Sequence, residues 1–316
     1  MPNTRQGSFH LFRILGIDVF LHWTWFAVAV IEIVYLRGRY TSPVWSVLEY
    51  LSLFLIVLLH EFGHALACRQ VGGSANQIML WPLGGVAYVS PPQRPGATLW
   101  SLAAGPLVNV ILMAPLGAAL WAANMAGWAQ TMPNAYQWIR AVLFIDVVLL
   151  GFNLLPVYPL DGGQILQSFL WFFMGRGRSL AISTIVGFVG AASFVLLALW
   201  MRSIWLVVIA GYMLMNCWKG LKGAFVLMKI EKLPRRNGFA CPSCGSKPLL
   251  GKRWRCSSCN GAFDIFETGS VCPHCGVQHP STMCVDCQTL SPLREWAAAG
   301  AIRGVSAAAG SSPITE

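Results

Sequence analysis

Two histidines and a glutamate lie inside an apolar run, where ionisable side chains are costly to place. His60, Glu61 and His64 belong to the segment FLIVLLHEFGHALACRQ, residues 54–70. Histidines four residues apart share one face of a helix and can bind one metal ion, and the adjacent glutamate can take a proton from water that the metal activates. The pattern therefore predicts a metal-dependent hydrolytic site in a membrane span. The alternative is that these side chains only hydrogen-bond neighbouring helices.

A third ligand is expected, because catalytic zinc sites usually have three protein ligands and leave one position for water. Asp161 is the best candidate, since it follows a proline-broken helix end and precedes two glycines that allow close backbone approach. It could instead cap the following helix. Topology favours the ligand, because two spans running in the same direction deliver HEFGH and Asp161 to one side of the membrane. Asp146 is a rival, but it lies about four turns away and is predicted to be hydrogen-bonded within the bundle.

The composition places the chain in a membrane. Of its 316 residues, 56% are hydrophobic and only 11% are charged, whereas a typical soluble domain has about 25% charged residues. Six apolar segments reach or approach the roughly 20 residues that a spanning helix needs. They are residues 19–36, 44–68, 99–125, 138–156, 180–200 and 204–221. The expected fold class is an α-helical polytopic membrane protein with about six transmembrane helices.

Basic residues predict the orientation. Cytoplasmic loops of membrane proteins carry an excess of Lys and Arg near the ends of the spans. With the N-terminus inside, twelve such residues fall on the inner side and four on the outer side. This distribution accounts for most of the formal charge of +10 without a nucleic-acid partner. We therefore expect an integral, multi-pass membrane protein with both termini in the cytoplasm.

The chain changes character after residue 238, because the apolar runs stop and cysteines begin. Eight of the ten cysteines form four CxxC pairs: Cys241/Cys244, Cys256/Cys259, Cys272/Cys275 and Cys284/Cys287. This spacing is typical of tetrahedral thiolate zinc sites, and two consecutive CxxC…CxxC sets predict two structural zinc ions in a zinc-ribbon-like domain. A disulfide-linked module is disfavoured, since the tail lies on the reducing side of the membrane. An iron–sulfur cluster is a further alternative.

These features divide the sequence into parts. Residues 1–18 are predicted to be an N-terminal cytoplasmic tail, residues 19–232 the membrane domain and residues 239–290 the cysteine-rich domain. The Ala/Gly/Ser-rich residues 297–316 are predicted to be disordered. Residues 75–89 have short apolar runs around a Pro and Gly-Gly break, which predicts a re-entrant β-hairpin, with a cytoplasmic loop as the alternative.

The motifs together resemble the site-2 protease family of intramembrane zinc metalloproteases. The likeness rests on HEFGH at 60–64, on NLLPVYPLDGG at 153–163 and on AAGPLVN at 103–109, which is similar to the family's GPxxN element. PLGGVAY at 82–88 and LHWTW at 21–25 also fit the bacterial and archaeal members. The expected location is therefore a prokaryotic cell membrane.

The resemblance implies hydrolysis of a peptide bond within or next to a transmembrane segment of a membrane-protein substrate. His60, His64 and Asp161 would bind the catalytic zinc ion, Glu61 would be the general base, and Asn153 would hold the substrate backbone or the oxyanion. The expected partners are a transmembrane protein substrate and the lipid bilayer. Because a helical substrate must unwind before cleavage, its extended form could pair with the edge of the predicted hairpin.

A different function stays open at this point. The chain could be a non-proteolytic membrane adaptor that recruits a cytoplasmic protein partner through its zinc-ribbon tail, although the presence of Glu61 and every expected ligand argues against loss of activity. Basic residues around Trp254 more often form a solvated face than a nucleic-acid site. Asn109, in the GPLVN element, is expected either to satisfy helix contacts or to take part in catalysis.

Overall fold

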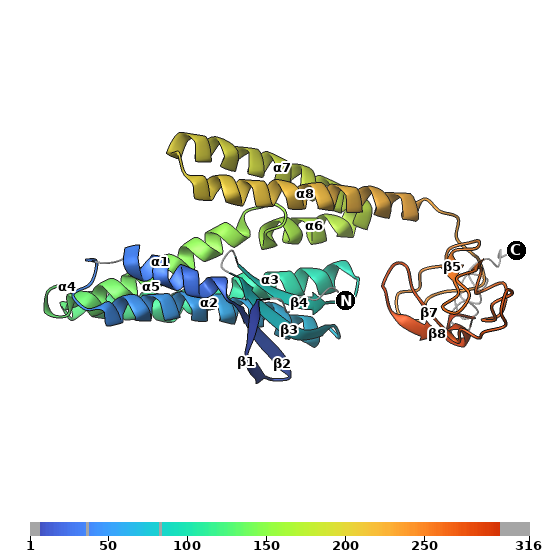
Figure 1. Ribbon diagram of the computed structural model, residues 1–316, viewed down its shortest axis with the longest axis horizontal. Coiled ribbons are helices and arrows are strands. Elements are labelled where there is room, and N and C mark those ends of the chain that lie inside the picture. The colour runs from blue at the N-terminus through green and yellow to red at the C-terminus, as the bar shows by residue number, and fades with distance from the viewer. Residues whose placement is uncertain (1–6, 36–37, 82–83, 298–316) are drawn as a thin grey trace, which may run out of the picture. The chain divides into compact units, whose positions relative to one another are not determined.

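The computed structural model describes residues 7–35, 38–81 and 84–297. The chain divides into two compact units, one formed by Met1–Pro91 with Pro95–Phe225 and the other by Pro92–Arg94 with Val226–Glu316. The first unit holds most of the helices and a four-stranded sheet, and the second holds the cysteine-rich module (Figure 1). The segment 297–316, predicted to be disordered, lies outside the described residues except for Ala297.

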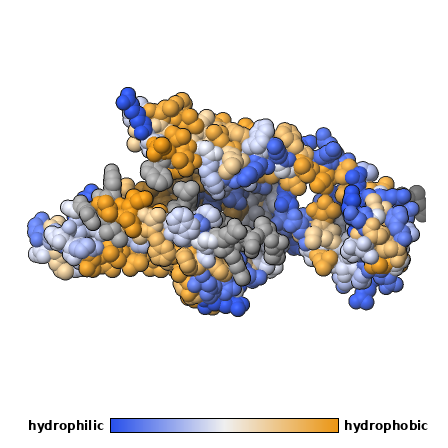
Figure 2. All heavy atoms as spheres, viewed as in Figure 1, coloured by the Kyte–Doolittle hydropathy of each residue, from blue (hydrophilic) through white to orange (hydrophobic). Residues whose placement is uncertain are grey.

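Four helices of the described chain are long and apolar enough to span a bilayer. They are α2 (Pro43–Gln70), α3 (Pro95–Met125), α5 (Pro133–Leu154) and α7 (Arg176–Met201). These helices expose many Leu, Ile, Val, Phe and Trp side chains, and hydrophobic residues dominate much of this unit in Figure 2. Such surfaces fit lipid rather than water. The chain is therefore an integral membrane protein of mainly helical fold, as predicted.

The first and last predicted spans differ from the other four. Helix α1 (Thr24–Tyr35) has 12 residues, about 18 Å of helix against a hydrocarbon core of about 30 Å. It is short because residues 19–22, predicted to lie at the start of this span, belong to β-strand β2 (Ile17–His22). Helix α8 (Ile204–Glu231) has 28 residues, and the short helix α4 (Trp128–Thr131) links α3 to α5. The count of six spans stays a prediction.

A four-stranded sheet packs against α2. Strands β1 (Ser8–Ile14) and β2 (Ile17–His22) form a hairpin, β2 pairs in parallel with β3 (Ser74–Trp81), and β3 pairs antiparallel with β4 (Gly84–Ser90). The β3–β4 pair confirms the predicted hairpin, whereas β1 and β2 were not predicted. Apolar side chains of β2, β3 and α2 share one core. This packing fixes β4, an edge strand, beside α2.

The cysteine-rich module has a core of its own. It contains two short hairpins, β5 (Trp254–Arg255) with β6 (Ala262–Phe263) and β7 (Ser281–Met283) with β8 (Leu290–Pro292). Cysteines pack there with three large aromatic residues, Phe263, Phe266 and Trp296. Since Trp296 is buried, the core extends beyond residue 290, where the cysteine-rich domain was predicted to end. So small a core fits a unit that depends on bound metal for stability.

Candidate metal centre and its surroundings

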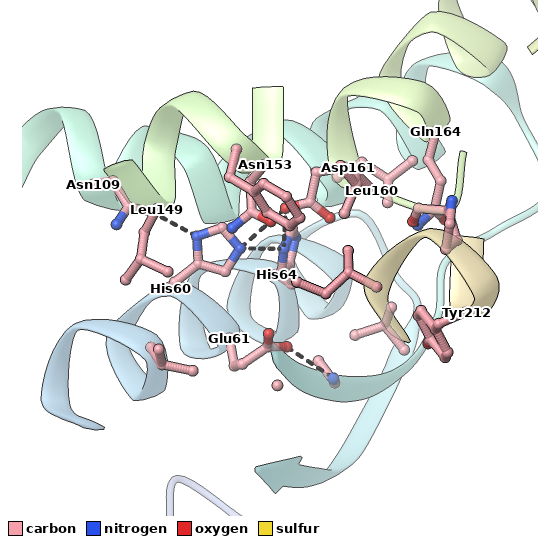
Figure 3. Close-up of a pocket in the computed structure, with 18 of the residues that line it drawn as sticks. His60, Glu61, His64, Asn109, Leu149, Asn153, Leu160, Asp161, Gln164 and Tyr212 are labelled. Carbon is pink, nitrogen blue, oxygen red and sulfur yellow. Dashed lines mark hydrogen bonds and ion pairs between the residues drawn. The ribbon is translucent and has the colours of Figure 1, made fainter. Parts of the chain in front are cut away.

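Three donor atoms from distant parts of the sequence meet in the membrane unit. His60 Nε2 lies 3.1 Å from His64 Nε2 and 3.0 Å from Asp161 Oδ2, and His64 Nε2 lies 3.3 Å from the same oxygen. Both histidines are buried on α2, and Asp161 faces them from the start of α6 (Asp161–Met174; Figure 3). The structure thus brings together the three residues predicted to be ligands of the catalytic metal.

The other ring nitrogen of each histidine meets an acceptor on α3. His64 Nδ1 lies 2.8 Å from the backbone oxygen of Ser101, and His60 Nδ1 lies 2.6 Å from Asn109 Oδ1. Because both partner atoms are oxygens that accept hydrogen bonds, each Nδ1 carries the proton in this arrangement and each Nε2 keeps a lone pair. Two lone pairs and a carboxylate oxygen that face one another repel unless a cation lies among them. Zinc fits this donor set, since imidazole nitrogen and carboxylate oxygen are among its usual ligands.

Gly105 leaves space at the point where the two imidazoles converge. A Cβ on this residue of α3 would lie 2.2 Å from His64 Nε2 and 2.8 Å from His60 Nε2. A side chain would therefore fill the space into which both lone pairs point. Gly63 of α2 is equally tight, because its Cβ would lie 2.6 Å from the backbone oxygen of Ala104. The two glycines let α2 and α3 pack closely around the donor set.

Asp161 is positioned by a tight break between α5 and α6. A Cβ on Gly162 would lie 2.3 Å from the backbone oxygen of Leu154, and Gly163 packs equally closely on the backbone of the break. The glycines therefore allow the first turn of α6 to lie directly against the end of α5. Asp161 is the first residue of α6, and the N-cap is Leu160. The carboxylate faces the histidines instead of capping the helix.

Glu61 lies in the same cavity, next to β4. Its Oε2 accepts a hydrogen bond from the backbone N–H of Ala87 at 2.8 Å. A Cβ on Gly85 would lie 2.2 Å from Glu61 Cγ, so glycine is needed for β4 to approach the glutamate this closely. A cavity of about 650 Å³ is lined by His60, His64, Asp161, Glu61 and alternate residues of β4 (Figure 3). The candidate base, the donor set and the strand edge thus share one space.

The remaining predicted polar residues fall in two places. Asn153, in the last turn of α5, lines the cavity (Figure 3). Asp146 is not part of the donor set, because its Oδ1 accepts a hydrogen bond from Asn109 Nδ2 at 2.7 Å. Sequence reasoning missed Ser101 and Ala87, which act through backbone atoms. Residue type gives no signal for such roles.

The eight tail cysteines form two groups that do not follow sequence order. The outer site contains Cys241, Cys244, Cys284 and Cys287, and the inner site contains Cys256, Cys259, Cys272 and Cys275. The prediction of two consecutive sets was therefore wrong in its pairing. The reason is that the two ends of the module meet, with the Ala240 N–H donating to the Trp296 backbone oxygen at 3.0 Å, which brings the first and last pairs together.

Each cysteine group has the four thiols of a structural zinc site. Within each group the sulfur atoms lie within 4.8 Å of one another. A hydrogen bond from the Cys284 thiol lowers the pKa of Cys244, which favours the thiolate form of this sulfur. The cysteine clusters thus support a zinc-ribbon-like tail.

Comparisons with known proteins give consistent matches. The model of peptidase family M50 matches residues 49–142 and 122–197. The zinc metalloprotease MJ0392 of Methanocaldococcus jannaschii is 33% identical over 180 residues, which cover 57% of this chain and 50% of that protein. Rip3 of Mycobacterium tuberculosis, whose name also includes zinc metalloprotease, is 31% identical over 180 residues, which cover 52% of this chain and 44% of that protein. The chain spans about half of the length of these curated relatives.

Solved structures are also among the matches. The site-2 protease from Methanocaldococcus jannaschii shares 29% sequence identity, with 68% of this chain and 95% of that chain covered and a TM-score of 0.49.

The fold and the site together define a polytopic membrane protein with a metal-type donor set inside its helical bundle. The family match includes both HEFGH at 60–64 and Asp161. This part of the chain is similar to peptidase family M50, the family of the site-2 proteases.

Proposed function

We propose that the protein is an intramembrane zinc metalloprotease that hydrolyses a peptide bond within or next to a transmembrane segment of a membrane-protein substrate. One observation carries the proposal: donor atoms of His60, His64 and Asp161 converge in a cavity that also holds Glu61. This is the arrangement that metal-assisted hydrolysis needs, with ligands, a base and space for a carbonyl. The match of residues 49–197 to the model of a peptidase family supports the same activity.

The residues of the cavity take distinct roles in this proposal. Zinc held by His60, His64 and Asp161 would lower the pKa of water toward neutrality and polarise the scissile carbonyl. Glu61 takes the proton from the attacking water and passes it to the leaving amine. Asn153, whose side chain lines the same cavity, holds the substrate backbone or the oxyanion through its amide.

Strand β4 is the element proposed to receive the substrate. A transmembrane helix keeps its carbonyls in hydrogen bonds, so the segment must unwind before one of them can be attacked. β4 lies at the edge of the sheet, and its residues Gly85, Ala87 and Val89 line the cavity. An extended segment can add to this edge through main-chain hydrogen bonds. The scissile bond would then lie beside Glu61.

The proposal extends to the metal content and the orientation. We propose three zinc ions per chain, one in the membrane centre and one in each of the two cysteine sites, because four thiolates make one structural site. The distribution of Lys and Arg favours both termini on the cytoplasmic side of a prokaryotic membrane.

The cysteine-rich module is proposed to bind a cytoplasmic protein. Met283 and Leu290 pair across β7 and β8, and their side chains are 58% and 65% exposed. Two large apolar side chains in register on a small module favour a protein contact. A purely adaptor function without proteolysis is disfavoured by the complete donor set around Glu61.

Replacing Glu61 with Gln tests the protease proposal. The full-length protein is placed in liposomes with a single-span substrate, and cleavage and zinc are measured on the same samples. Loss of the base should lower cleavage by at least ~10²-fold and leave the zinc content unchanged. Glu49→Gln is the matched control, because Glu49 is a buried carboxylate of the same helix that pairs with Tyr40 and Arg39.

Two outcomes would contradict the proposal in different ways. Undiminished cleavage by the Glu61→Gln protein would rule out the metalloprotease mechanism, and a cellular function that is indifferent to Glu61 would favour the adaptor. Zinc content that is unchanged when His60→Ala and His64→Ala are combined would show that HEFGH does not bind the metal.

A further inference from the structure

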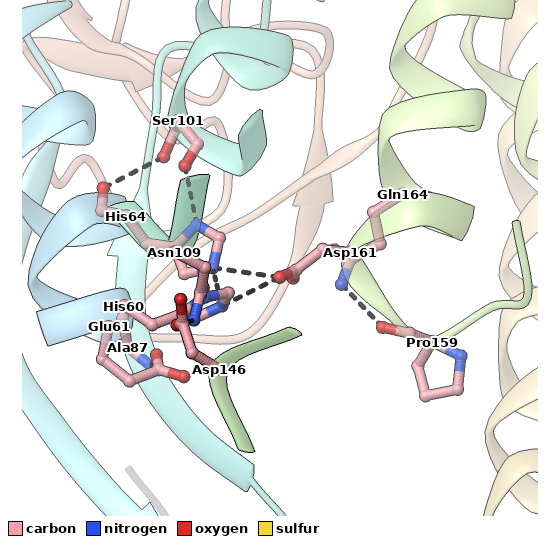
Figure 4. Close-up of polar contacts among 10 residues, drawn as sticks. All are labelled: His60, Glu61, His64, Ala87, Ser101, Asn109, Asp146, Pro159, Asp161 and Gln164. Atoms are coloured by element: carbon pink, nitrogen blue, oxygen red, sulfur yellow. Dashed lines mark hydrogen bonds and ion pairs between the residues drawn. The ribbon is translucent and has the colours of Figure 1, made fainter. Parts of the chain in front are cut away.

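A chain of two hydrogen bonds runs from Asp146 through Asn109 to His60. Asn109 Nδ2 donates to Asp146 Oδ1 at 2.7 Å, and Asn109 Oδ1 lies 2.6 Å from His60 Nδ1. The three side chains come from α5, α3 and α2 (Figure 4), and Asp146 and Asn109 are 0% and 1% exposed. The second oxygen of Asp146 is buried and has no hydrogen-bond partner among the described residues. The carboxylate is thus directed at Asn109 alone.

The direction of this chain determines which nitrogen of His60 is free. A carboxylate accepts hydrogen bonds, so Asn109 must turn its NH₂ group toward Asp146 and its oxygen toward His60. The oxygen in turn requires a proton on His60 Nδ1. His60 Nε2 therefore keeps its lone pair and points at His64 and Asp161.

The two histidines differ in how their protonation is fixed. His64 Nδ1 meets the backbone oxygen of Ser101, which cannot present a donor instead. His60 Nδ1 meets a side-chain amide, which can rotate by half a turn and present its NH₂ group. That rotation would require an unprotonated Nδ1 and move the proton to Nε2, where it would block the metal. Asp146 is the group that opposes this rotation.

We propose that Asp146 and Asn109 are positioning residues that hold His60 in the tautomer able to bind the metal. The inference rests on the proposed metal centre and deepens it. It also explains a carboxylate placed in the middle of a spanning helix, where an ionisable group is costly and needs a function. If these residues only joined α3 to α5, zinc binding would not depend on which end of the Asn109 amide faces His60.

The test compares zinc affinity and the His60 tautomer in the full-length protein. Zinc affinity is measured by competition with a chelator, and the contribution of the cysteine sites is removed by subtracting the combined His60→Ala and His64→Ala protein. The tautomer is read from ¹⁵N NMR of labelled histidine. Asp146→Leu and Asn109→Leu should each bind zinc 10–100-fold more weakly, the usual effect of losing a group that orients a ligand. In Asp146→Leu the proton should move to Nε2.

A rescue separates positioning from mere support of the bundle. Asn109→Asp replaces the amide that faces His60 Nδ1 with a carboxylate, which accepts a hydrogen bond through either oxygen. Asp146 is then no longer needed to hold the accepting atom toward His60. The combination of Asn109→Asp with Asp146→Leu should regain zinc affinity and the Nδ1-protonated tautomer, although no hydrogen bond from residue 109 to residue 146 is restored. Glu49→Leu removes a buried carboxylate that does not contact His60, and it should leave both readings unchanged.

The results distinguish this inference from the metal centre itself. Zinc that does not depend on His60 and His64 would overturn the proposed centre. Zinc that depends on them but binds equally well in folded Asp146→Leu or Asn109→Leu, with the tautomer unchanged, would overturn only the positioning role. A double variant that regains no zinc affinity would also overturn it. Should Asp146→Leu not fold, Asn109→Leu gives an independent reading.

Discussion

The membrane centre and the cysteine-rich module build their metal-type sites in opposite ways. Each module site is closed by four thiols from two CxxC turns, all between residues 241 and 287. The membrane centre takes two candidate ligands from α2 and a third that lies 101 positions after His60, and it opens into a cavity. A structural site needs only a closed shell, whereas a catalytic site must leave a position free. The open site therefore depends on helix packing, and the closed sites depend on local turns.

The largest effect is expected from a substitution that disturbs helix packing around the membrane centre without changing a candidate ligand. Gly105→Ala should weaken zinc binding at the membrane centre roughly 100-fold, the upper end of effects seen when groups around a metal site are changed. The reason is that a Cβ there would lie 2.2 Å from His64 Nε2. Zinc content and cleavage are measured on the same purified protein.

Gly117→Ala provides the matched control for that variant. Gly117 lies on the same helix, and apart from the adjacent backbone of that helix no atom of the described residues lies within 4 Å of the position that its Cβ would take. It should keep both zinc and activity. Equal behaviour of the two variants would mean that Gly105 has no special relation to the metal centre.

The second test concerns the pairing of the cysteines. Replacing Cys241 and Cys244 with Ser should remove one zinc ion and make Cys284 and Cys287 reactive toward an alkylating reagent. Cys272 and Cys275 should stay protected. Peptide mapping by mass spectrometry locates the alkylated thiols. If Cys256 and Cys259 become reactive instead, the sites are consecutive and the inner and outer arrangement is wrong.

The smallest expected effect concerns the strand edge. Ala87→Pro removes the backbone N–H that donates a hydrogen bond to Glu61 and that an added strand could use instead. Proline itself is tolerated on an edge strand. We expect kcat/KM to fall about tenfold, the equivalent of one hydrogen bond of about 1.4 kcal/mol, with zinc unchanged. Ala87→Ser keeps the N–H and is the control. A proline variant as active as the serine variant would exclude this edge from substrate binding.

The sequence was sufficient to predict that HEFGH and Asp161 would meet, because span direction places both at the same depth. The strands β1 and β2 could not be predicted in this way. Residues 19–22 begin the apolar segment that continues into α1, and a short apolar run does not distinguish a buried strand from a helix. The strand is favoured by pairing with β3, more than fifty residues later in the chain.

The cysteines show the converse limit. Their spacing predicted four turns of the metal-binding type, but four units can be joined in three ways and the spacing does not choose among them. The choice depends on contacts far apart in the sequence, such as that between Ala240 and Trp296. Asn109 and Asp146 were likewise recognised as polar residues of the bundle, but their common relation to His60 required the arrangement of three helices.

The nested cysteine sites imply an order of assembly. The inner site joins Cys259 to Cys272, 13 positions apart, whereas the outer site joins Cys244 to Cys284, 40 positions apart. Closing the longer loop first would cost about 1 kcal/mol more in chain entropy. During synthesis the four inner thiols also leave the ribosome before Cys284 and Cys287 do. The inner site therefore forms first and shortens the free chain that the outer site must close. Cys284 and Cys287, the last cysteines to be synthesised, then complete the site to which Cys241 and Cys244 belong.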